Sequence, residues 1–311
     1  MEMRKLGALG NVSALTLGGA GIGGHWGATD RQEAVATVRE AVREGITFID
    51  GAPTYGRGEA EEVIGETFDG KLPPGVRIST KFSLGNPDAG DVLPNFEKSL
   101  NESFSRLRLG HVDVFFLHGQ IIPDCMVDVA PGTTRTLFAE AVRPAMDQLK
   151  RRGVIGAWGV TGIGVPESIL DTLHDDAPPL AVQAIANVLN SPGSLRRFEG
   201  PSRAREIIDA GYRREVGVFG IRAVQGGALT HGFDRKLPEN SPDMVDYERA
   251  VTFRGIANEV GESPAALAHR YSLTMKGISS VALGVKNRVE LRECIDAESK
   301  GPLDESLMQL I

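Results

Sequence analysis

The chain has 311 residues, 41% of them hydrophobic, and a formal net charge of −7. This length and apolar content allow one barrel or two smaller domains. Acidic and basic residues are mixed without a basic cluster, which argues against nucleic acid as a partner. No apolar run approaches the roughly 18 residues that span a membrane, and no apolar signal segment follows the first residues. We therefore expect a cytoplasmic protein with no membrane partner. The two cysteines, Cys125 and Cys294, are far apart and indicate neither a disulfide framework nor a metal site.

Segments with strand and helix signals alternate along the whole chain. Strands are predicted over 13–17, 46–49, 77–81, 112–118, 155–161, 180–185, 216–221 and 278–283. Helices are predicted over 31–44, 59–68, 93–107, 138–152, 202–210 and 246–260, and from Pro166, Ser263 and Asn287 onward. The connections 119–136 and 222–245 are long and follow the fourth and seventh strands. Strand–helix units repeated without a composition break predict a parallel sheet closed into a (β/α)8 TIM barrel, with one domain over 1–311.

A glycine-rich stretch, 18–24, follows the first predicted strand and has the G-x-G-x-x-G spacing of dinucleotide-binding loops. In such loops the third glycine opens a helix, whereas residues 25–29 separate it here from the predicted cap at Asp30. We therefore favour a glycine-rich first βα loop at a barrel mouth over a Rossmann phosphate loop. In that interpretation Trp26 forms a wall of the pocket.

Polar side chains stand where three neighbouring predicted strands end. Asp50 ends the second strand, Tyr55 follows five residues later, and Lys81 and His118 end the next two strands. Chemistry in α/β barrels is placed at such strand ends. A lysine ammonium lowers the high pKa of a tyrosine, and an aspartate keeps the buried lysine charged. With a histidine that orients a carbonyl oxygen, these residues can pass a proton to that oxygen while a nicotinamide supplies hydride.

Each of these residues also has a structural interpretation. A strand-end aspartate often pairs locally, a tyrosine can line a pocket, a lysine can form a rim ion pair and a histidine can be a hydrogen-bonded core residue. Their joint placement on neighbouring strands favours the catalytic interpretation.

The local contexts Phe-Ile-Asp, Tyr-Gly, Ser-Thr-Lys and Phe-Leu-His resemble the catalytic tetrad of the aldo-keto reductase superfamily, and the resemblance covers essentially the whole chain. It implies an NAD(P)-dependent oxidoreductase for a small carbonyl or alcohol substrate, such as a sugar lactol or an aldehyde, with Tyr55 as general acid or base. It further implies a nicotinamide site that includes Thr161, Gln183, Asn187, Phe219 and Ile221. The run 220–227 resembles a bacterial branch that includes NAD-linked sugar 1-dehydrogenases and pyridoxal 4-dehydrogenase.

The segment after the last predicted strand resembles the family's adenosine-phosphate loop. It implies cofactor contacts from Gly284, Lys286, Arg288, Glu290 and Glu293, and Cys294 stands where an asparagine is usual. The carboxylate of Glu290 would repel a 2′-phosphate and could bond a free ribose hydroxyl, whereas Lys286 and Arg288 could attract the phosphate. Because the carboxylate of Glu290 repels a 2′-phosphate, we favour NAD(H) over NADP(H) as the cofactor.

Two further hypotheses stay open. One is a cofactor-binding regulatory subunit of the same fold with little turnover, and the other is a barrel lyase that uses Lys81 as a Schiff base. For the substrate pocket we expect Trp26 and Phe82, together with the two long loops. The sequence predicts no metal site and leaves the oligomeric state and the substrate open.

Overall fold

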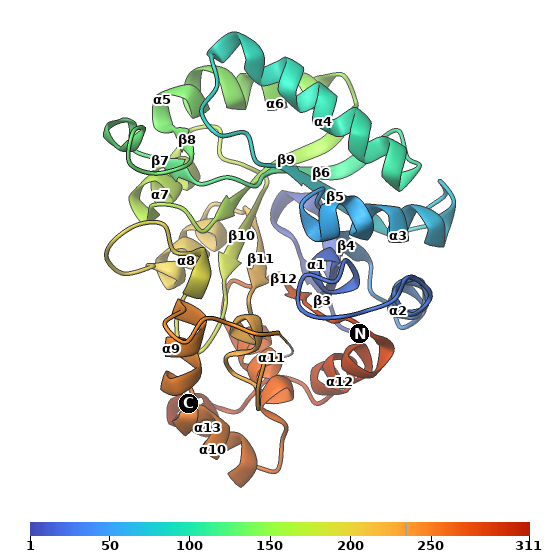
Figure 1. Ribbon diagram of the computed structural model, residues 1–311, viewed down its shortest axis with the longest axis vertical. Coiled ribbons are helices and arrows are strands. Elements are labelled where there is room, and N and C mark those ends of the chain that lie inside the picture. Colours follow the sequence, from blue (N-terminus) through green and yellow to red (C-terminus); the bar gives the residue numbers. More distant parts are fainter. Residues whose placement is uncertain (234) are drawn as a thin grey trace.

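A computed structural model describes residues 1–233 and 235–311. Within these residues, eight parallel strands close into a barrel with helices around it (Figure 1), which confirms the predicted (β/α)8 fold. The strands are β3 (Leu15–Gly18), β4 (Phe48–Asp50), β5 (Arg77–Phe82), β6 (Val112–Leu117), β9 (Ile155–Gly162), β10 (Ala181–Ile185), β11 (Gly217–Ile221) and β12 (Ser280–Leu283). Strand neighbours follow chain order, and β12 pairs with β3 to close the barrel.

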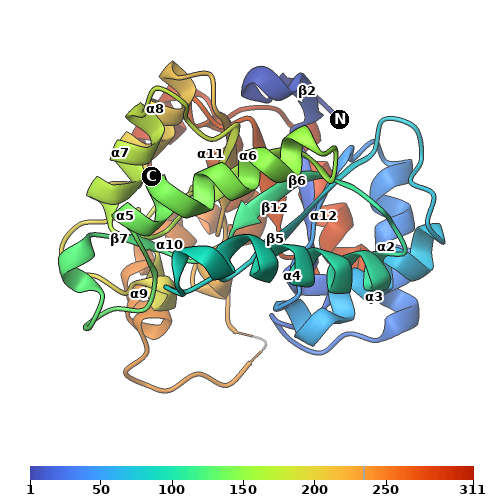
Figure 2. The same cartoon turned by 90° about the horizontal axis from the view of Figure 1, so that it is seen from above.

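The helices between these strands form the outer layer, in which α4 and α6 lie side by side (Figure 2). They are α2 (Arg31–Arg43), α3 (Glu59–Phe68), α4 (Val92–Leu107), α6 (Arg143–Arg151), α7 (Pro166–His174), α8 (Ala204–Arg213), α11 (Pro264–Thr274) and α12 (Arg288–Ser299). The predicted caps at Asp30, Ser263 and Asn287 are confirmed, because each side chain accepts a hydrogen bond from a backbone N–H in the first turn of its helix.

Shorter elements fill the connections. They are α1 (Gly19–Ile22), α5 (Arg135–Leu137), a π-helical turn (Phe138–Val142), α13 (Glu305–Leu310), and the short paired strands β7 (Ile121–Ile122) and β8 (Thr133–Thr134). None of the described helices is long and apolar enough to cross a membrane.

The segment predicted as one helix over 246–260 is two helices, α9 (Pro242–Arg249) and α10 (Val251–Glu259). The first begins earlier than predicted because Ser241 caps it and Pro242 occupies its first turn. The helices are separated at Ala250, whose ψ of 6° is not helical and whose side chain is fully buried.

The barrel interior contains a small aromatic cluster below the strand ends. Phe48 and Phe219 have ring centroids 4.8 Å apart, and Phe116 lies 6.1 Å from Phe219. Leu6 joins this cluster from an N-terminal hairpin of β1 (Met3–Lys5) and β2 (Asn11–Ser13). The hairpin therefore helps to close the amino-terminal end of the barrel, and the opposite end is left to hold a ligand.

Candidate active site

A cavity of about 670 Å³ lies at the carboxyl ends of the strands. Its walls include Asp50, Tyr55, His118, Thr161, Gln183, Ile221, Gly284, Lys286, Glu290, Glu293 and Trp26. These predicted site residues come from segments spread over most of the chain, and the closed barrel brings them to one place. The volume is in the range of sites that enclose small molecules and cofactors.

A buried ion pair forms the base of this cavity. Lys81 Nζ donates to Asp50 Oδ2 at 2.7 Å and to the carbonyl oxygen of Gly51 at 2.8 Å. The two side chains are 0% and 5% exposed, respectively. Burial favours loss of the lysine proton, but the charges of Asp50 and Tyr55 raise the pKa of Lys81 above its ordinary value. Lys81 is therefore a fixed positive charge beneath the cavity.

Tyr55 stands directly beside this charge, with Lys81 Nζ 4.7 Å from the centre of its ring. Burial raises the pKa of Tyr55, the charge of Lys81 lowers it, Asp50 raises it, and a hydrogen bond with Lys81 lowers it again. The balance keeps the phenol protonated at neutral pH. Its proton is still easier to remove than burial alone would allow, since Lys81 stabilises the tyrosinate.

His118 lies on the other side of Tyr55. The two rings meet edge to face with centroids 5.7 Å apart, and His118 Nδ1 is 3.5 Å from Thr54 Oγ1. Burial, followed by the charge of Lys81, lowers the pKa of His118 to about 3. The imidazole is therefore neutral at working pH, and one ring nitrogen can donate a hydrogen bond into the cavity.

Two further donors hold Asp50, and the sequence analysis identified neither of these contacts. Ser79 Oγ donates to Asp50 Oδ1 at 2.6 Å, and Gln183 Nε2 donates to the same oxygen at 2.9 Å. The period of two along β5 was the available signal for Ser79, since it places Ser79 and Lys81 on the same face. A carboxylate only accepts, so the amide nitrogen of Gln183 must face Asp50 and its oxygen is left for a ligand.

Apart from Lys81, which lies beneath the cavity, four predicted residues do not contribute to its walls among the described residues. Phe219 packs in the aromatic cluster of the barrel interior, and Phe82 contacts Phe96 edge to face at 6.1 Å. Asn187 donates to the backbone oxygen of Ser191 and to Gln225 Oε1. Arg288 pairs with Glu33 outside the cavity. Their predicted contacts with cofactor or substrate therefore stay predictions, and the structure places these side chains outside the walls of the cavity.

The basic residues of the last loop are matched by carboxylates. Lys286 Nζ pairs with Glu290 Oε1, and Glu290 Oε2 accepts from the backbone N–H of Lys286 at 2.9 Å. Arg288 Nη2 lies 2.9 Å from Glu33 Oε2 on α2. A phosphate approaching either cation would meet a carboxylate already bound to it.

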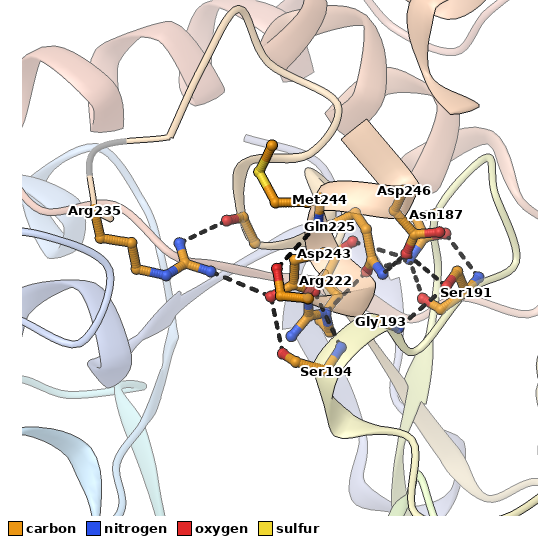
Figure 3. A network of polar contacts seen from close by, with 12 residues as sticks. Asn187, Ser191, Gly193, Ser194, Arg222, Gln225, Arg235, Asp243, Met244 and Asp246 are labelled. Atoms are coloured by element: carbon orange, nitrogen blue, oxygen red, sulfur yellow. Dashed lines mark hydrogen bonds and ion pairs between the residues drawn. The ribbon is translucent and has the colours of Figure 1, made fainter. Parts of the chain in front are cut away.

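A polar network ties the loops around the cavity together (Figure 3). Arg222 Nη2 pairs with Asp243 Oδ1 of α9 at 2.7 Å, and both side chains are at most 5% exposed. Gln225 Nε2 donates to Asp246 Oδ2 at 2.6 Å, and Asn187 bonds Gln225 from the preceding loop. The segment 222–245 is thereby anchored at both of its ends.

Trp26 joins this anchored loop to the glycine-rich loop after β3. The guanidinium of Arg235 lies 5.0 Å from the centre of the Trp26 ring, and His25 meets the same ring edge to face at 4.7 Å. Arg222 and Arg235 also line the cavity and provide positive charge for an anionic ligand. Among the described residues, no group of His, Cys, Asp or Glu side chains is arranged to hold a metal ion.

These features define a class of protein: a parallel (β/α)8 barrel with a buried Asp–Lys pair, a tyrosine and a neutral histidine at its strand ends. The model of the aldo/keto reductase family matches residues 14–311, and the chain belongs to this family.

Several relatives match along nearly their whole length, among them two dehydrogenases. L-Galactose dehydrogenase of Arabidopsis thaliana is 28% identical, over 100% of this chain and 93% of the relative. Pyridoxal 4-dehydrogenase of Microbacterium luteolum is 24% identical, over 94% and 91%. The holo structure of an aldo-keto reductase from Bacillus halodurans superposes with a TM-score of 0.75 at 21% identity, covering 100% of this chain and 95% of the other, which supports the fold. The chain is thus an NAD(P)-dependent oxidoreductase that acts on small carbonyl or alcohol substrates.

Proposed function

We propose that the chain acts as one domain over 1–311 and transfers hydride between NAD(H) and a small carbonyl or alcohol substrate, with Tyr55 as the general acid or base. The observation that carries this proposal is the buried charge of Lys81, held between Asp50 and Tyr55 at the base of a cavity large enough for a cofactor. Apolar residues in place of the buried ion pair would stabilise the fold equally well, so stability alone does not account for a buried lysine.

In the direction of reduction, the substrate carbonyl lies between Tyr55 and His118. The neutral imidazole donates a hydrogen bond to the carbonyl oxygen and orients it. Tyr55 gives its proton to that oxygen, and Lys81 stabilises the tyrosinate that remains. A nicotinamide, when bound, would supply the hydride for the carbonyl carbon. In the direction of oxidation, the tyrosinate form of Tyr55, stabilised by Lys81, would take the proton from the alcohol, and the oxidised nicotinamide would accept the hydride.

The cofactor is held by the side chains that line the cavity. The amide oxygen of Gln183, whose nitrogen is turned to Asp50, could accept a hydrogen bond from the carboxamide, and Thr161 lies beside it on the neighbouring strand. Arg222 and Arg235 line the same cavity and would offer positive charge to the phosphates. We assign NAD(H) as the preferred cofactor because Lys286 and Arg288 are each paired with a carboxylate. A 2′-phosphate would have to separate these pairs and lie close to Glu290.

For the substrate we propose a sugar lactol or an aldehyde on a ring. L-Galactose dehydrogenase and pyridoxal 4-dehydrogenase are relatives whose names indicate such substrates. His25 and Trp26 line the cavity near Tyr55, and they offer a neutral hydrogen-bonding group and an aromatic face to a polar ring.

A titration of protein fluorescence with NADH and NADPH, combined with turnover assays, tests the proposal. We expect tighter binding of NADH, and we expect Tyr55→Phe to bind NADH normally but to lose turnover. Binding of neither cofactor, or near-normal turnover by Tyr55→Phe, would refute the proposal. Cofactor binding without turnover of any lactol or aldehyde would favour the regulatory-subunit hypothesis.

The Schiff-base lyase hypothesis conflicts with the state of Lys81. A Schiff base needs a neutral and accessible amine, whereas the pKa of Lys81 is raised and its side chain is fully buried. Borohydride reduction in the presence of a carbonyl substrate should therefore leave Lys81 unmodified.

A further inference from the structure

Ser79 bonds a carboxylate on the neighbouring barrel strand. It lies on β5, two residues before Lys81, and its side chain is fully buried. Its hydroxyl donates to Asp50 Oδ1 at 2.6 Å, on the adjacent strand β4, where Ser79 and Asp50 are direct register partners. The hydroxyl therefore touches the carboxylate that holds Lys81 and does not contact the cavity itself.

Three side-chain donors share the two oxygens of Asp50. Oδ1 accepts from Ser79 and Gln183, and Oδ2 accepts from Lys81. Two donors on one oxygen fix the rotation of the carboxylate, so that Oδ2 is directed at Lys81. An ammonium has three N–H groups, and two of them go to Asp50 and to the backbone oxygen of Gly51. The third is left for Tyr55.

We propose that Ser79 is a positioning residue of the proton relay: by holding Asp50 Oδ1, it aims Lys81 at Tyr55 and offsets part of the carboxylate charge that Tyr55 experiences. The inference rests on the proposed role of Tyr55 as general acid or base. It goes beyond that role because Ser79 touches neither substrate nor cofactor and acts only through Asp50.

The sign of the expected effect follows from the charges around Tyr55. The titratable groups that face it are Asp50, Lys81, His118 and His25. The pKa values of both histidines are lowered and that of Lys81 is raised, so these three groups keep one charge state from neutral to moderately alkaline pH. The Asp50 charge raises the pKa of Tyr55. Loss of the Ser79 hydroxyl leaves more of that charge uncompensated, so the pKa of Tyr55 should rise further.

The experiment compares Ser79→Ala, Ser79→Cys and a matched control, Ser280→Ala. Ser280 is also a fully buried barrel serine, but its hydroxyl bonds Thr16 at 2.7 Å, away from the relay. Each protein is assayed from neutral to alkaline pH with NADH and para-nitrobenzaldehyde, and with NAD⁺ and L-galactose. Thermal midpoints and NADH affinities are measured in parallel. The cysteine variant nearly keeps the serine volume with only a weak donor, so it covers the case in which the alanine variant fails to fold.

We expect both Ser79 variants to shift the alkaline limb of the pH–rate profile upward by roughly half a unit to one unit, the shift that one hydrogen bond can supply. Oxidation at neutral pH should fall by a factor of about three to ten on the same basis, with NADH affinity unchanged. Ser280→Ala should lower the thermal midpoint without shifting the alkaline limb of the pH–rate profile.

A Ser79 variant that loses stability but keeps the wild-type limb would overturn the inference and leave the proposed function intact. A wild-type protein that turns over neither probe and binds no cofactor would overturn the proposed function, and the inference with it.

Discussion

The buried pair of Asp50 and Lys81 allows the catalytic and structural roles of one lysine to be separated. In Lys81→Met the side chain keeps its length and loses its charge, and Asp50 becomes a buried carboxylate with only two neutral donors, Ser79 and Gln183. Removing one partner of a buried ion pair costs about 3–5 kcal/mol. Because both remaining donors stay on Oδ1, we place the expected loss of unfolding free energy at the lower end, about 3 kcal/mol.

The double variant Asp50→Asn/Lys81→Met removes both charges. It should recover most of this stability, with a coupling energy of about 2 kcal/mol between the two sites, because a neutral amide can still use Ser79 and Gln183 as partners. Turnover should not recover in the double variant, since no charge is left to stabilise the tyrosinate of Tyr55.

Denaturation in urea, followed by tryptophan fluorescence and far-ultraviolet circular dichroism, gives the stabilities, and a coupled NADH assay gives the rates. Two results would refute the reasoning. A double variant no more stable than Lys81→Met would show that the unpaired carboxylate is not the source of the loss. Turnover by Lys81→Met within a factor of a few of wild type would show that the lysine charge does not support Tyr55.

Three further predictions concern other parts of the site. Burial lowers the pKa of His118 from 6.5 to about 3 in the folded protein. Between these two pH values, the unfolded chain binds a proton on this imidazole and the folded protein does not. Its contribution to stability is complete above the ordinary pKa and is lost as pH falls toward the folded value, by up to about 1.4 kcal/mol per pH unit. His118→Gln should flatten the measured slope by that amount. Glu290→Gln should shift the ratio of NADPH to NADH affinity toward NADPH by about tenfold, which is ~1.4 kcal/mol of removed repulsion. Asp243→Ala should leave Arg222 as a buried unpaired cation, lower the stability by about 3 kcal/mol and speed cofactor release.

Each of these three has its own contrary result. An identical pH slope in wild type and His118→Gln would mean that the imidazole is not held neutral by burial. A cofactor ratio unchanged in Glu290→Gln would remove the electrostatic basis for the NAD(H) assignment. For Asp243, the control is Asp209→Ala, which breaks an exposed pair with Arg213 and should cost less than about 1 kcal/mol. Equal losses in the two variants would refute the claim that burial makes the Asp243 pair important.

The barrel and the base of its cavity were predictable because both depend on local signals. A strand that ends in a charged side chain places that side chain at the carboxyl-terminal face of a parallel barrel, whatever the rest of the chain does. Asp50 and His118 each follow an apolar run of this kind, and Lys81 follows a strand signal that alternates apolar and polar residues. Helix caps are equally local, which is why Asp30 and Asn287 could be placed from sequence.

The sequence did not predict how deep inside the barrel each strand side chain lies. Phe219 and Ile221 share a face of β11, so the alternation of the strand could not separate them. Two residues correspond to roughly 6.6 Å along the strand, enough to move a side chain from the cavity wall into the interior. Ile221 lines the cavity, whereas Phe219 packs against Phe48. The link between Gln183 and Asp50 spans 133 residues and crosses the barrel, so no local pattern could indicate it.

Asn187 connects two of the loops around the cavity. The resemblance implies a contact with the cofactor, and in the structure the Asn187 amide bonds Ser191 and Gln225, which in turn bonds Asp246 of α9. The loop after β10 is thereby joined to the loop that carries Arg222 and Arg235. Because those two guanidinium groups line the cavity, their placement depends on this hydrogen-bonded chain. Asparagine is suited to the position because one amide supplies both donors and an acceptor, whereas an aspartate could not donate to Gln225. A substitution there should therefore weaken cofactor binding through the loops and leave the proton relay unchanged.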